Sequence, residues 1–319
     1  MKYRFLILNV TVLGAALFLS GCSINKMAMR MKPETVAPYI PSVLAKNEAR
    51  LAKHPDDQGL ILNTGSLYVM YANAFVQGPA EFLPPVQYEE RQAALGEAKR
   101  LYLKGADILY DGLDKKYPGF STVSFVNNTL ASYLAKMDET DVPSLYWTAA
   151  GYLSAFSLDP FDLKMGRRVP DLMSYVNRAY ELDPDFNNGA LDDFYILAYA
   201  SLPDTLGGDK SQVDLHFKRA LEKSGGKLAG PHVSYAQVVS VPAGDYDNFK
   251  SHLEAALALN PKKNRANRLV NIISQRKARA LLDNARDYFI DIDDDDDDDD
   301  DDFEYDDDDF EELFEEFFE

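Results

Sequence analysis

Apolar residues recur at helical spacing from about residue 36 to residue 286. Leu101, Ile108, Leu109 and Leu113 follow one another at steps of one, four and seven residues, which keeps them on one face of a helix. Clusters such as Asp183-Pro184-Asp185 interrupt these runs at short intervals and predict the turns between helices. No alternating run of Val, Ile and Thr is long enough for a sheet, so the spacing predicts an all-α fold of about eleven helices.

Two of the predicted helices end in the same phrase. The repeated motif is Ala179-x-x-Leu182-x-Pro184 in one helix and Ala256-x-x-Leu259-x-Pro261 in the other. A third segment, Phe217-x-x-Ala220, has the same register, with Gly225 in place of the proline. The small residue lets two helices approach closely, and the proline ends the helix so that the chain can reverse. This pattern resembles a degenerate tetratricopeptide repeat and predicts a solenoid of helical hairpins. Ordinary helical hairpins would give part of the same pattern by chance.

The N-terminal 22 residues have the layout of a secretory signal. Lys2 and Arg4 precede a mostly apolar run, and Leu19-Ser20-Gly21-Cys22 follows it. The run resembles a bacterial lipobox, which implies cleavage before Cys22 and acylation of its thiol. A cleaved signal with an incidental cysteine, or an uncleaved anchor, is the alternative. Cys22 is the single cysteine of the chain, so an acylated Cys22 leaves no thiol for a disulfide, a metal or catalysis.

The negative charge is concentrated at the C-terminus. Residues 291–319 hold 15 Asp and 6 Glu without any Lys or Arg, whereas the other 290 residues carry 31 acidic against 33 basic side chains. A near-neutral body argues against nucleic-acid binding. Ten consecutive aspartates from Asp293 to Asp302 repel one another, so residues 291–319 are predicted to be disordered. Four apolar residues of the tail lie at helical spacing: Phe310, Leu313, Phe314 and Phe317. This spacing is typical of a short helix that docks in a groove of a partner. A solvent-exposed tail without a partner is the alternative.

Several segments in order resemble one family. They include Tyr71-Ala-Asn-Ala-Phe75-Val-Gln77, Asp141-Val-Pro143 running to Gly151, Ala179 to Pro184, Gly207-Gly208, His216 to Ala220, Ser224 to Lys227 with Ala229-Gly230-Pro231, and Arg268 through Arg279. After a lipobox, this series resembles the T component associated with TRAP transporters. The resemblance covers roughly residues 22–290 and does not extend to the acidic tail.

The resemblance implies a lipoprotein with cryptic tetratricopeptide-like repeats that faces the periplasm. It further implies a homo-oligomer, a trimer in the family, that partners the solute-binding protein of a TRAP system and binds or channels a small organic or hydrophobic ligand. Ser23 after the cysteine favours the outer membrane over the inner one. The predicted organisation is a signal peptide at 1–21, a lipidated linker at 22–35, a helical repeat domain at 36–290 and the acidic tail. The alternative function is an envelope scaffold that binds proteins but no ligand.

The sequence lacks the motifs of an enzyme or a metal site. His54, His216, His232 and His252 stand apart without an HExxH or HxH pair, and surface or capping positions are expected for them. No GxSxG, GxGxxG or Walker loop occurs in a suitable context, and Gly225-Gly226-Lys227 is interpreted as a helix end. We expect no catalytic residue, no metal and no cofactor.

The candidate ligand or partner contacts are aromatic and arginine side chains. Tyrosine combines a flat apolar face with a polar tip, which suits a channel or an interface, and arginine holds carboxylates. We therefore select Tyr71, Phe75, Tyr146, Trp147, Arg167 and Arg276. We also expect Tyr152, Phe156, Tyr195 and Tyr199 to line the inner face of the solenoid. Packing between helices is the alternative for the aromatic residues, and a solvated face is the alternative for the arginines.

Overall fold

The computed structural model describes residues 30–124 and 129–289 of the 319-residue chain. Within those ranges the regular structure is helical throughout and includes no strand, which confirms the all-α prediction. None of the described helices combines the length and the apolar character that crossing a bilayer requires. The predicted signal peptide, Cys22 and the acidic tail lie outside the described residues.

The helices follow the order of the predicted runs. They are α2 (Pro33–Val36), α3 (Ile40–Leu51), α4 (Gln58–Tyr71), α5 (Gly78–Glu81), α6 (Tyr88–Lys116), α7 (Leu130–Leu134), α8 (Val142–Leu158), α9 (Leu163–Gly166), α10 (Val169–Leu182), α11 (Ala190–Ser201), α12 (Val213–Ser224), α13 (Gly230–Tyr235), α14 (Val241–Ala243), α15 (Tyr246–Leu257) and α16 (Arg268–Asp283). Nine of these are at least 12 residues long. The longest of them is α6, with 29 residues.

Two π-helical segments extend the helices that they follow. Residues Ala72–Gln77 connect α4 to α5 without a break, and Ala236–Ser240 connect α13 to α14 in the same way. A π-helical turn contains one residue more than an α-helical turn, and it therefore rotates the side chains that follow it about the helix axis. The two segments therefore change which side chains α5 and α14 present to their neighbours.

The glycine and proline clusters that interrupt the helical runs of the sequence end the helices as expected. Gly225 and Gly226 adopt φ of 61° and 65° after α12, and the Gly226 amide donates to the Leu221 carbonyl at 2.8 Å. These left-handed angles favour glycine, and the hydrogen bond satisfies a carbonyl of the last turn. Ala179, Ala220 and Ala256 of the repeated phrase are each at most 1% exposed. Their small side chains lie where neighbouring helices come close.

The largest core forms where α4, α6 and α8 pack side by side, and it continues into α10 and α11. Gly65 of α4 and Gly105 of α6 meet at the crossing of their helices. A Cβ placed on Gly105 would lie 2.6 Å from the Gly65 carbonyl oxygen, closer than atoms can pack. Glycine at both positions therefore permits the two backbones to approach.

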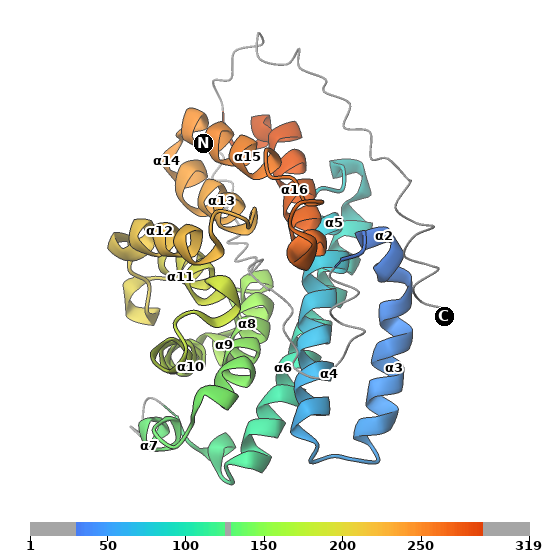
Figure 1. The fold of residues 1–319 in the computed structure, drawn as a ribbon, viewed down its shortest axis with the longest axis vertical. Helices are drawn as coiled ribbons and strands as arrows, with labels where there is room; N and C mark the ends of the chain where they lie inside the picture. Colours follow the sequence, from blue (N-terminus) through green and yellow to red (C-terminus); the bar gives the residue numbers. More distant parts are fainter. Residues whose placement is uncertain (1–29, 125–128, 290–319) are drawn as a thin grey trace.

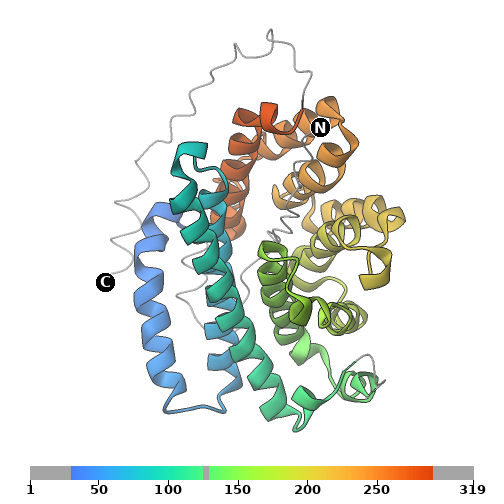
Figure 2. The same ribbon diagram turned by 180° about the vertical axis from the view of Figure 1, so that it is seen from behind.

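The C-terminal helices bring the chain back to its beginning. A second core joins α13, α15 and α16, and Phe82 after α5 packs against it. In Figure 1 and, from behind, in Figure 2, the hairpins follow one another in an arc until α16 lies beside α2, α4 and α5. Two ion pairs cross this seam, Arg276 with Glu34 and Lys277 with Glu81. We call the contact of α16 with α2 and α5 the closing seam.

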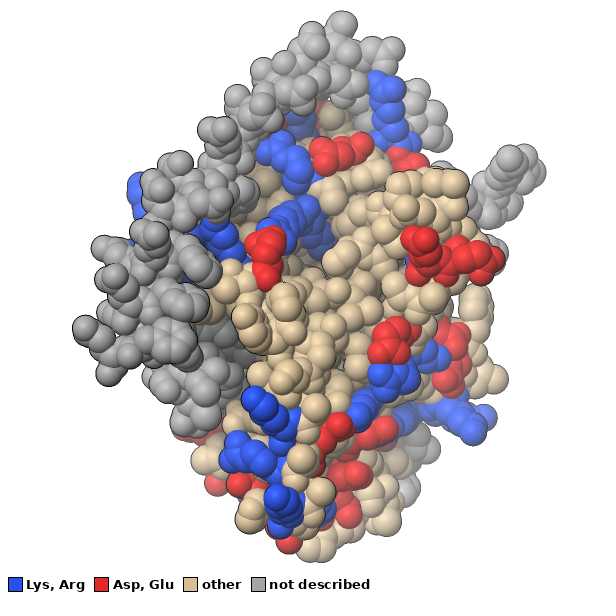
Figure 3. Space-filling view, turned by 90° about the vertical axis from the view of Figure 1, so that its right-hand side faces the viewer, with Lys and Arg blue, Asp and Glu red and all other residues tan. Residues whose placement is uncertain are grey.

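The surface of the described residues carries both signs of charge. On the face in Figure 3, Lys and Arg side chains mix with Asp and Glu over both the lower and the upper part, and a largely uncharged region lies between them. This mixture agrees with the near-neutral body that the sequence predicts.

Candidate functional site

Tyr71 and Phe75 lie where α4 passes into its π-helical segment. Their rings stack with centroids 6.1 Å apart and an interplanar angle of 29°. Both side chains are half-buried and pack against the main core. Because part of each ring stays exposed, the pair is accessible for contact with a partner or a ligand.

Tyr146 and Trp147 lie on α8 and are far more buried. Tyr146 has no exposed surface and Trp147 retains 5%, and their rings meet edge to face at 5.1 Å. Tyr146 also contacts Phe186 and Phe194, which begin the next hairpin, at 5.4 and 6.2 Å. Both rings contribute to the core, and the expectation that they also touch a ligand stays a prediction.

The two arginines lie on different elements. Arg167 is exposed between α9 and α10, whereas its neighbour Arg168 places its guanidinium 3.9 Å from the centre of the Tyr152 ring. Arg276 is exposed on α16 and pairs with Glu34 across the closing seam. The two arginines therefore lie on separate elements, and a ligand or partner contact at either one stays a prediction.

Tyr152, Tyr195 and Tyr235 make contacts between neighbouring helices. Tyr152 donates to Asp107 of α6 at 2.5 Å, and Tyr195 donates to Asn177 of α10 at 2.7 Å. Tyr235 of α13 contacts Phe217 of α12 at 4.7 Å. Each ring thus fills the groove between neighbouring hairpins, which is the core-packing alternative.

The sequence contains a signal for these packing positions. A tyrosine is followed by an aromatic residue four positions later and a proline eight positions later in Tyr71-Phe75-Pro79, Tyr152-Phe156-Pro160 and Tyr195-Tyr199-Pro203. Spacing by four keeps both rings on one helix face. Pro160 and Pro203 follow the ends of α8 and α11, whereas Pro79 lies inside α5, which continues from α4 without a break. The same spacing therefore occurs both in rings that pack between helices and in the half-buried Tyr71–Phe75 pair.

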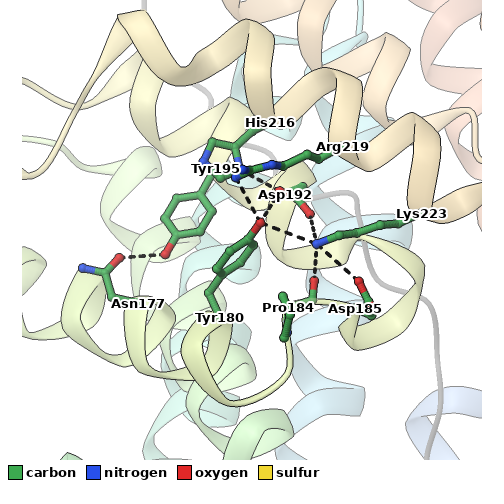
Figure 4. Close-up of polar contacts among 9 residues, drawn as sticks. All are labelled: Asn177, Tyr180, Pro184, Asp185, Asp192, Tyr195, His216, Arg219 and Lys223. Carbon is green, nitrogen blue, oxygen red and sulfur yellow. Dashed lines mark hydrogen bonds and ion pairs between the residues drawn. The ribbon is translucent and has the colours of Figure 1, made fainter.

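A buried polar network joins α10, α11 and α12 (Figure 4). The Asp192 carboxylate on α11 is fully buried and accepts from Lys223 at 2.7 Å and from Tyr180 at 3.1 Å. His216 Nδ1 lies 2.7 Å from the same carboxylate. His216 is 6% exposed, so the expectation of a surface or capping histidine is wrong for this residue. The network satisfies a buried charge and fixes two hairpins together.

His232 and His252 come together although 19 residues separate them in sequence. Their Nδ1 atoms lie 3.0 Å apart, between the rings of Phe217 and Tyr235. Burial is the main reason that the pKa of both rings is lowered, and the pKa of His232 falls to about 4. The pair is thus neutral at physiological pH, with one ring donating to the other. Sequence reasoning, which placed the four histidines apart, missed this contact.

Several buried side-chain polar atoms have no hydrogen-bond partner among the described residues. Five of them we call the interior polar set: the Tyr146 hydroxyl, both Asp193 carboxylate oxygens, the Ser274 hydroxyl and Lys277 Nζ. Burial has the largest effect on the Asp193 carboxyl, and its pKa is raised to about 6. The nearby Ser234 hydroxyl opposes that rise, but it does not meet the geometry of a hydrogen bond to Asp193. Buried polar groups in native proteins are rarely left unpaired, and those that are often mark a ligand or water site.

A chain of hydrogen bonds reaches one member of this set from the π-helical segment. Asn73 donates to the Tyr102 hydroxyl at 3.1 Å, Tyr102 donates to Gln77 at 2.6 Å, and Gln77 donates to Glu81 at 2.6 Å. Glu81 Oε2 then lies 3.4 Å from Lys277 Nζ on α16. We call these hydrogen bonds the relay, and through it the segment Tyr71–Gln77 connects to the closing seam.

The described residues do not assemble a metal site. No three His, Cys, Asp or Glu side chains converge anywhere in residues 30–124 and 129–289. Three of the described histidines have printed partners: His216 lies against the Asp192 carboxylate, and His232 and His252 lie against each other.

Comparison with known proteins agrees with this arrangement. Residues 31–289 match the family described as TRAP transporter T-component. A protein of Treponema pallidum (strain Nichols), described as uncharacterized, is 30% identical over 310 residues, which cover 87% of this chain and 96% of that protein. The resemblance that the ordered motifs suggested is confirmed. The chain belongs to the TRAP transporter T-component family, and its role lies with a TRAP transport system at the cell envelope.

Proposed function

We propose that this chain is a lipid-anchored, periplasm-facing partner of the solute-binding protein of a TRAP system, and that its interior takes a small organic ligand. The observation that carries the proposal is the family match over residues 31–289, which spans every described helix.

The interior polar set supports the ligand part of the proposal. Tyr146 and Asp193 belong to α8 and α11, whose packing brings Tyr146 against Phe194, the residue after Asp193. An unpaired buried hydroxyl or carboxylate costs about 1–3 kcal/mol, so a ligand that pairs with these atoms would recover that free energy. Trp147 lies beside Tyr146 and would report such binding through its fluorescence.

The partner is tested with purified proteins. The solute-binding protein of the same TRAP system should bind this chain in calorimetry or cosedimentation, with this chain as a homo-oligomer, a trimer as the family resemblance implies. The absence of binding to that protein, together with binding to other envelope proteins, would favour the scaffold alternative.

The anchor is tested at Cys22, which lies outside the described residues. Cys22→Ala removes the thiol that acylation requires and should release the protein from membranes into the soluble fraction. If the variant partitions into detergent as the parent does, the anchor is not a lipid on Cys22.

The ligand is tested at Tyr146. Tyr146→Phe removes a hydroxyl without a partner, so the variant should fold with undiminished stability yet change the response of Trp147 to the transported solute. Tyr102→Phe is the matched control, because its hydroxyl belongs to the relay and its loss should lower stability. An identical Trp147 response in the parent and in Tyr146→Phe would remove Tyr146 from the site.

A further inference from the structure

We propose that exposed lysine and arginine side chains beside the start of α16 bind the anionic headgroups of the bilayer that holds the lipid of Cys22. The proposal rests on the proposed function, because it assumes the lipid anchor, and it adds the face of the body that lies against the membrane. The lipid alone does not fix that orientation, because it is attached to the chain eight residues before the described body begins.

The last long helix and the loop before it hold a concentration of positive charge. Residues 255–282 contain no Asp or Glu and seven basic side chains: Lys262, Lys263, Arg265, Arg268, Arg276, Lys277 and Arg279. Arg276 and Lys277 face Glu34 and Glu81 across the closing seam. The three basic residues in the loop between α15 and α16, at positions 262, 263 and 265, are exposed. Because the segment has no acid of its own, this loop carries a net positive charge in a body that is nearly neutral as a whole.

Two further exposed basic residues meet this loop. Asn264 of the loop and Asn271 of α16 donate to the Lys227 carbonyl at 3.0 and 2.9 Å, which places Lys227 beside the loop. Arg268, in the first turn of α16, donates to the Arg30 carbonyl at 3.4 Å. Lys227 and Arg30 are both exposed. We call the five exposed cations that come together here the basic patch: Arg30, Lys227, Lys262, Lys263 and Arg265.

The chain between the anchor and the basic patch is short. Arg30 follows Cys22 by eight residues, and an extended chain spans at most about 3.6 Å per residue, so Arg30 lies within about 29 Å of the acylated residue. From Cys22 to Pro33 the sequence contains Lys26, Arg30 and Lys32 but no acidic residue. The lipid therefore keeps the basic patch close to the headgroups, and no negative charge of the linker opposes the contact.

The acidic tail begins at the opposite end of α15. Phe289, the last described residue, packs against Tyr246 and Phe249 at the start of α15, whereas the basic loop follows the end of that helix. The 12 residues of α15 correspond to about 18 Å at 1.5 Å per residue. Charges on a surface are largely screened beyond about 8 Å at physiological ionic strength. The positive and the negative region of the protein thus begin on separate parts of its surface.

The size of the basic patch matches what an anionic bilayer requires. Clusters of about four to eight lysine and arginine residues beside a membrane anchor bind anionic headgroups, and each residue strengthens the contact by about fivefold. A lipid combined with such a cluster attaches a protein at two points, whereas a lipid alone attaches it at one. With five exposed cations, the basic patch turns the loop before α16 toward the bilayer.

The test uses the acylated full-length protein in vesicles, with a fluorophore on one introduced thiol, because acylation occupies the single cysteine of the chain. Ala266→Cys places the label at an exposed position of the basic loop. Ala52→Cys is the control, exposed at the end of α3 that lies away from α2 and α16 (Figure 1). In vesicles with phosphatidylglycerol, a quencher on the lipid headgroup should quench the label at 266 about threefold more than the label at 52. About 0.5 M salt, or vesicles of phosphatidylcholine alone, should abolish the difference.

Two triple variants separate the basic patch from the net charge of the protein. The first removes the charge of the loop: Lys262→Gln, Lys263→Gln and Arg265→Gln. The second removes the same charge from exposed positions along and after α3: Lys46→Gln, Arg50→Gln and Lys53→Gln. The first variant should reduce the quenching at 266 to the value at 52, and the second should leave it unchanged. An equal loss in both variants would mean that only net charge matters and would overturn the basic patch.

The remaining outcomes distinguish this proposal from the lipid anchor. Equal quenching of the two labels in the parent, with the protein still bound to the vesicles, would overturn the orientation but leave the anchor. Failure of the parent protein to stay with the vesicles would contradict both proposals. Protection of the label at 266 from a water-soluble quencher in the Cys22→Ala protein without vesicles, relieved by salt, would mean that the acidic residues 291–319 cover the basic patch, and would also overturn the proposal.

Discussion

At the scale of single residues, the unexpected feature is how many buried polar atoms lack partners. The body has enough apolar residues to fill its core, yet Asp193 occupies a buried position on α11 with both oxygens unpaired. Its neighbour Asp192 is equally buried but fully paired with His216, Lys223 and Tyr180. Two adjacent aspartates in the same helix thus have opposite environments. We infer that Asp192 is retained for structure and Asp193 for binding.

Asp193→Asn tests the environment of this carboxylate through pH. The folded pKa of Asp193 is raised from 3.8 to about 6, so its contribution to stability is fully present below pH 3.8 and is lost as pH rises through 6. Asparagine does not titrate. The free energy of unfolding of the variant relative to the parent should therefore rise by about 3 kcal/mol between pH 3.5 and pH 7.

Urea unfolding of both proteins across that pH range measures the difference. A constant difference between the variant and the parent would show that Asp193 has an ordinary carboxylate pKa in the folded state. Asp247→Asn, at an exposed position of α15, is the control for the removal of one carboxylate.

At the scale of elements, the close crossing of α4 and α6 depends on glycine. Gly105→Ala would place a methyl group 2.6 Å from the Gly65 carbonyl and 2.9 Å from Tyr68 Cβ, so the helices must separate. We expect a loss of about 1–3 kcal/mol in the free energy of unfolding. Gly96→Ala on the same helix is the matched control, because nothing lies within 4 Å of its added Cβ. It should raise stability by about 0.4–1 kcal/mol.

Thermal unfolding distinguishes the two variants, because Gly105→Ala should lower the melting temperature and Gly96→Ala should raise it. Two glycine variants that lower the melting temperature equally would mean that intrinsic helix effects, rather than the crossing, determine the result. The sequence alone does not separate Gly96 from Gly105, because both lie within one helical run.

The contact between α13 and α15 should weaken in acid. The pKa values of His232 and His252 are both below 6.5, so their neutral pair contributes stability above pH 6.5 that is lost as pH falls toward 4. Tyr235, Phe217 and, through Tyr235, Asp214 surround the pair. His252→Phe keeps a ring against Tyr235 but removes one titrating group. The variant should therefore lose less stability than the parent between pH 6.5 and pH 4.

Chemical unfolding at several pH values checks this expectation. An identical acid dependence in the parent and in His252→Phe would mean that the pair does not titrate in this range. Exposed His54, replaced by Phe, serves as the control for the removal of a histidine.

At the scale of the whole molecule, periodicity predicts much of the fold. Helix class, most helix positions and the buried alanines of the repeated phrase follow from local spacing, because each helix satisfies its own backbone and buries one stripe. The closing seam and the His232–His252 contact do not follow, since they join residues that are distant in the chain. The aromatic residues illustrate the limit, because a helical stripe of Tyr152 and Phe156 does not reveal whether it faces a hairpin neighbour or the interior. The unpaired state of Ser274 and Lys277 depends on three-dimensional packing and has no signature in sequence.

The last prediction concerns the acidic tail, whose residues lie outside the described part of the chain. The described core ends at Phe289, whose ring contacts Phe249 at 5.0 Å and Tyr246 at 5.4 Å. Truncation after Ile290 keeps these contacts and removes about twenty net negative charges that cannot bury a core. The melting temperature should therefore change by no more than about 3 °C, equivalent to about 1 kcal/mol for a domain of this size. Truncation after Asp287 is the control, because it also removes Tyr288 and Phe289 and should lower the melting temperature further. If the two truncations destabilise the protein equally and by more than about 3 °C, the acidic residues themselves support the fold.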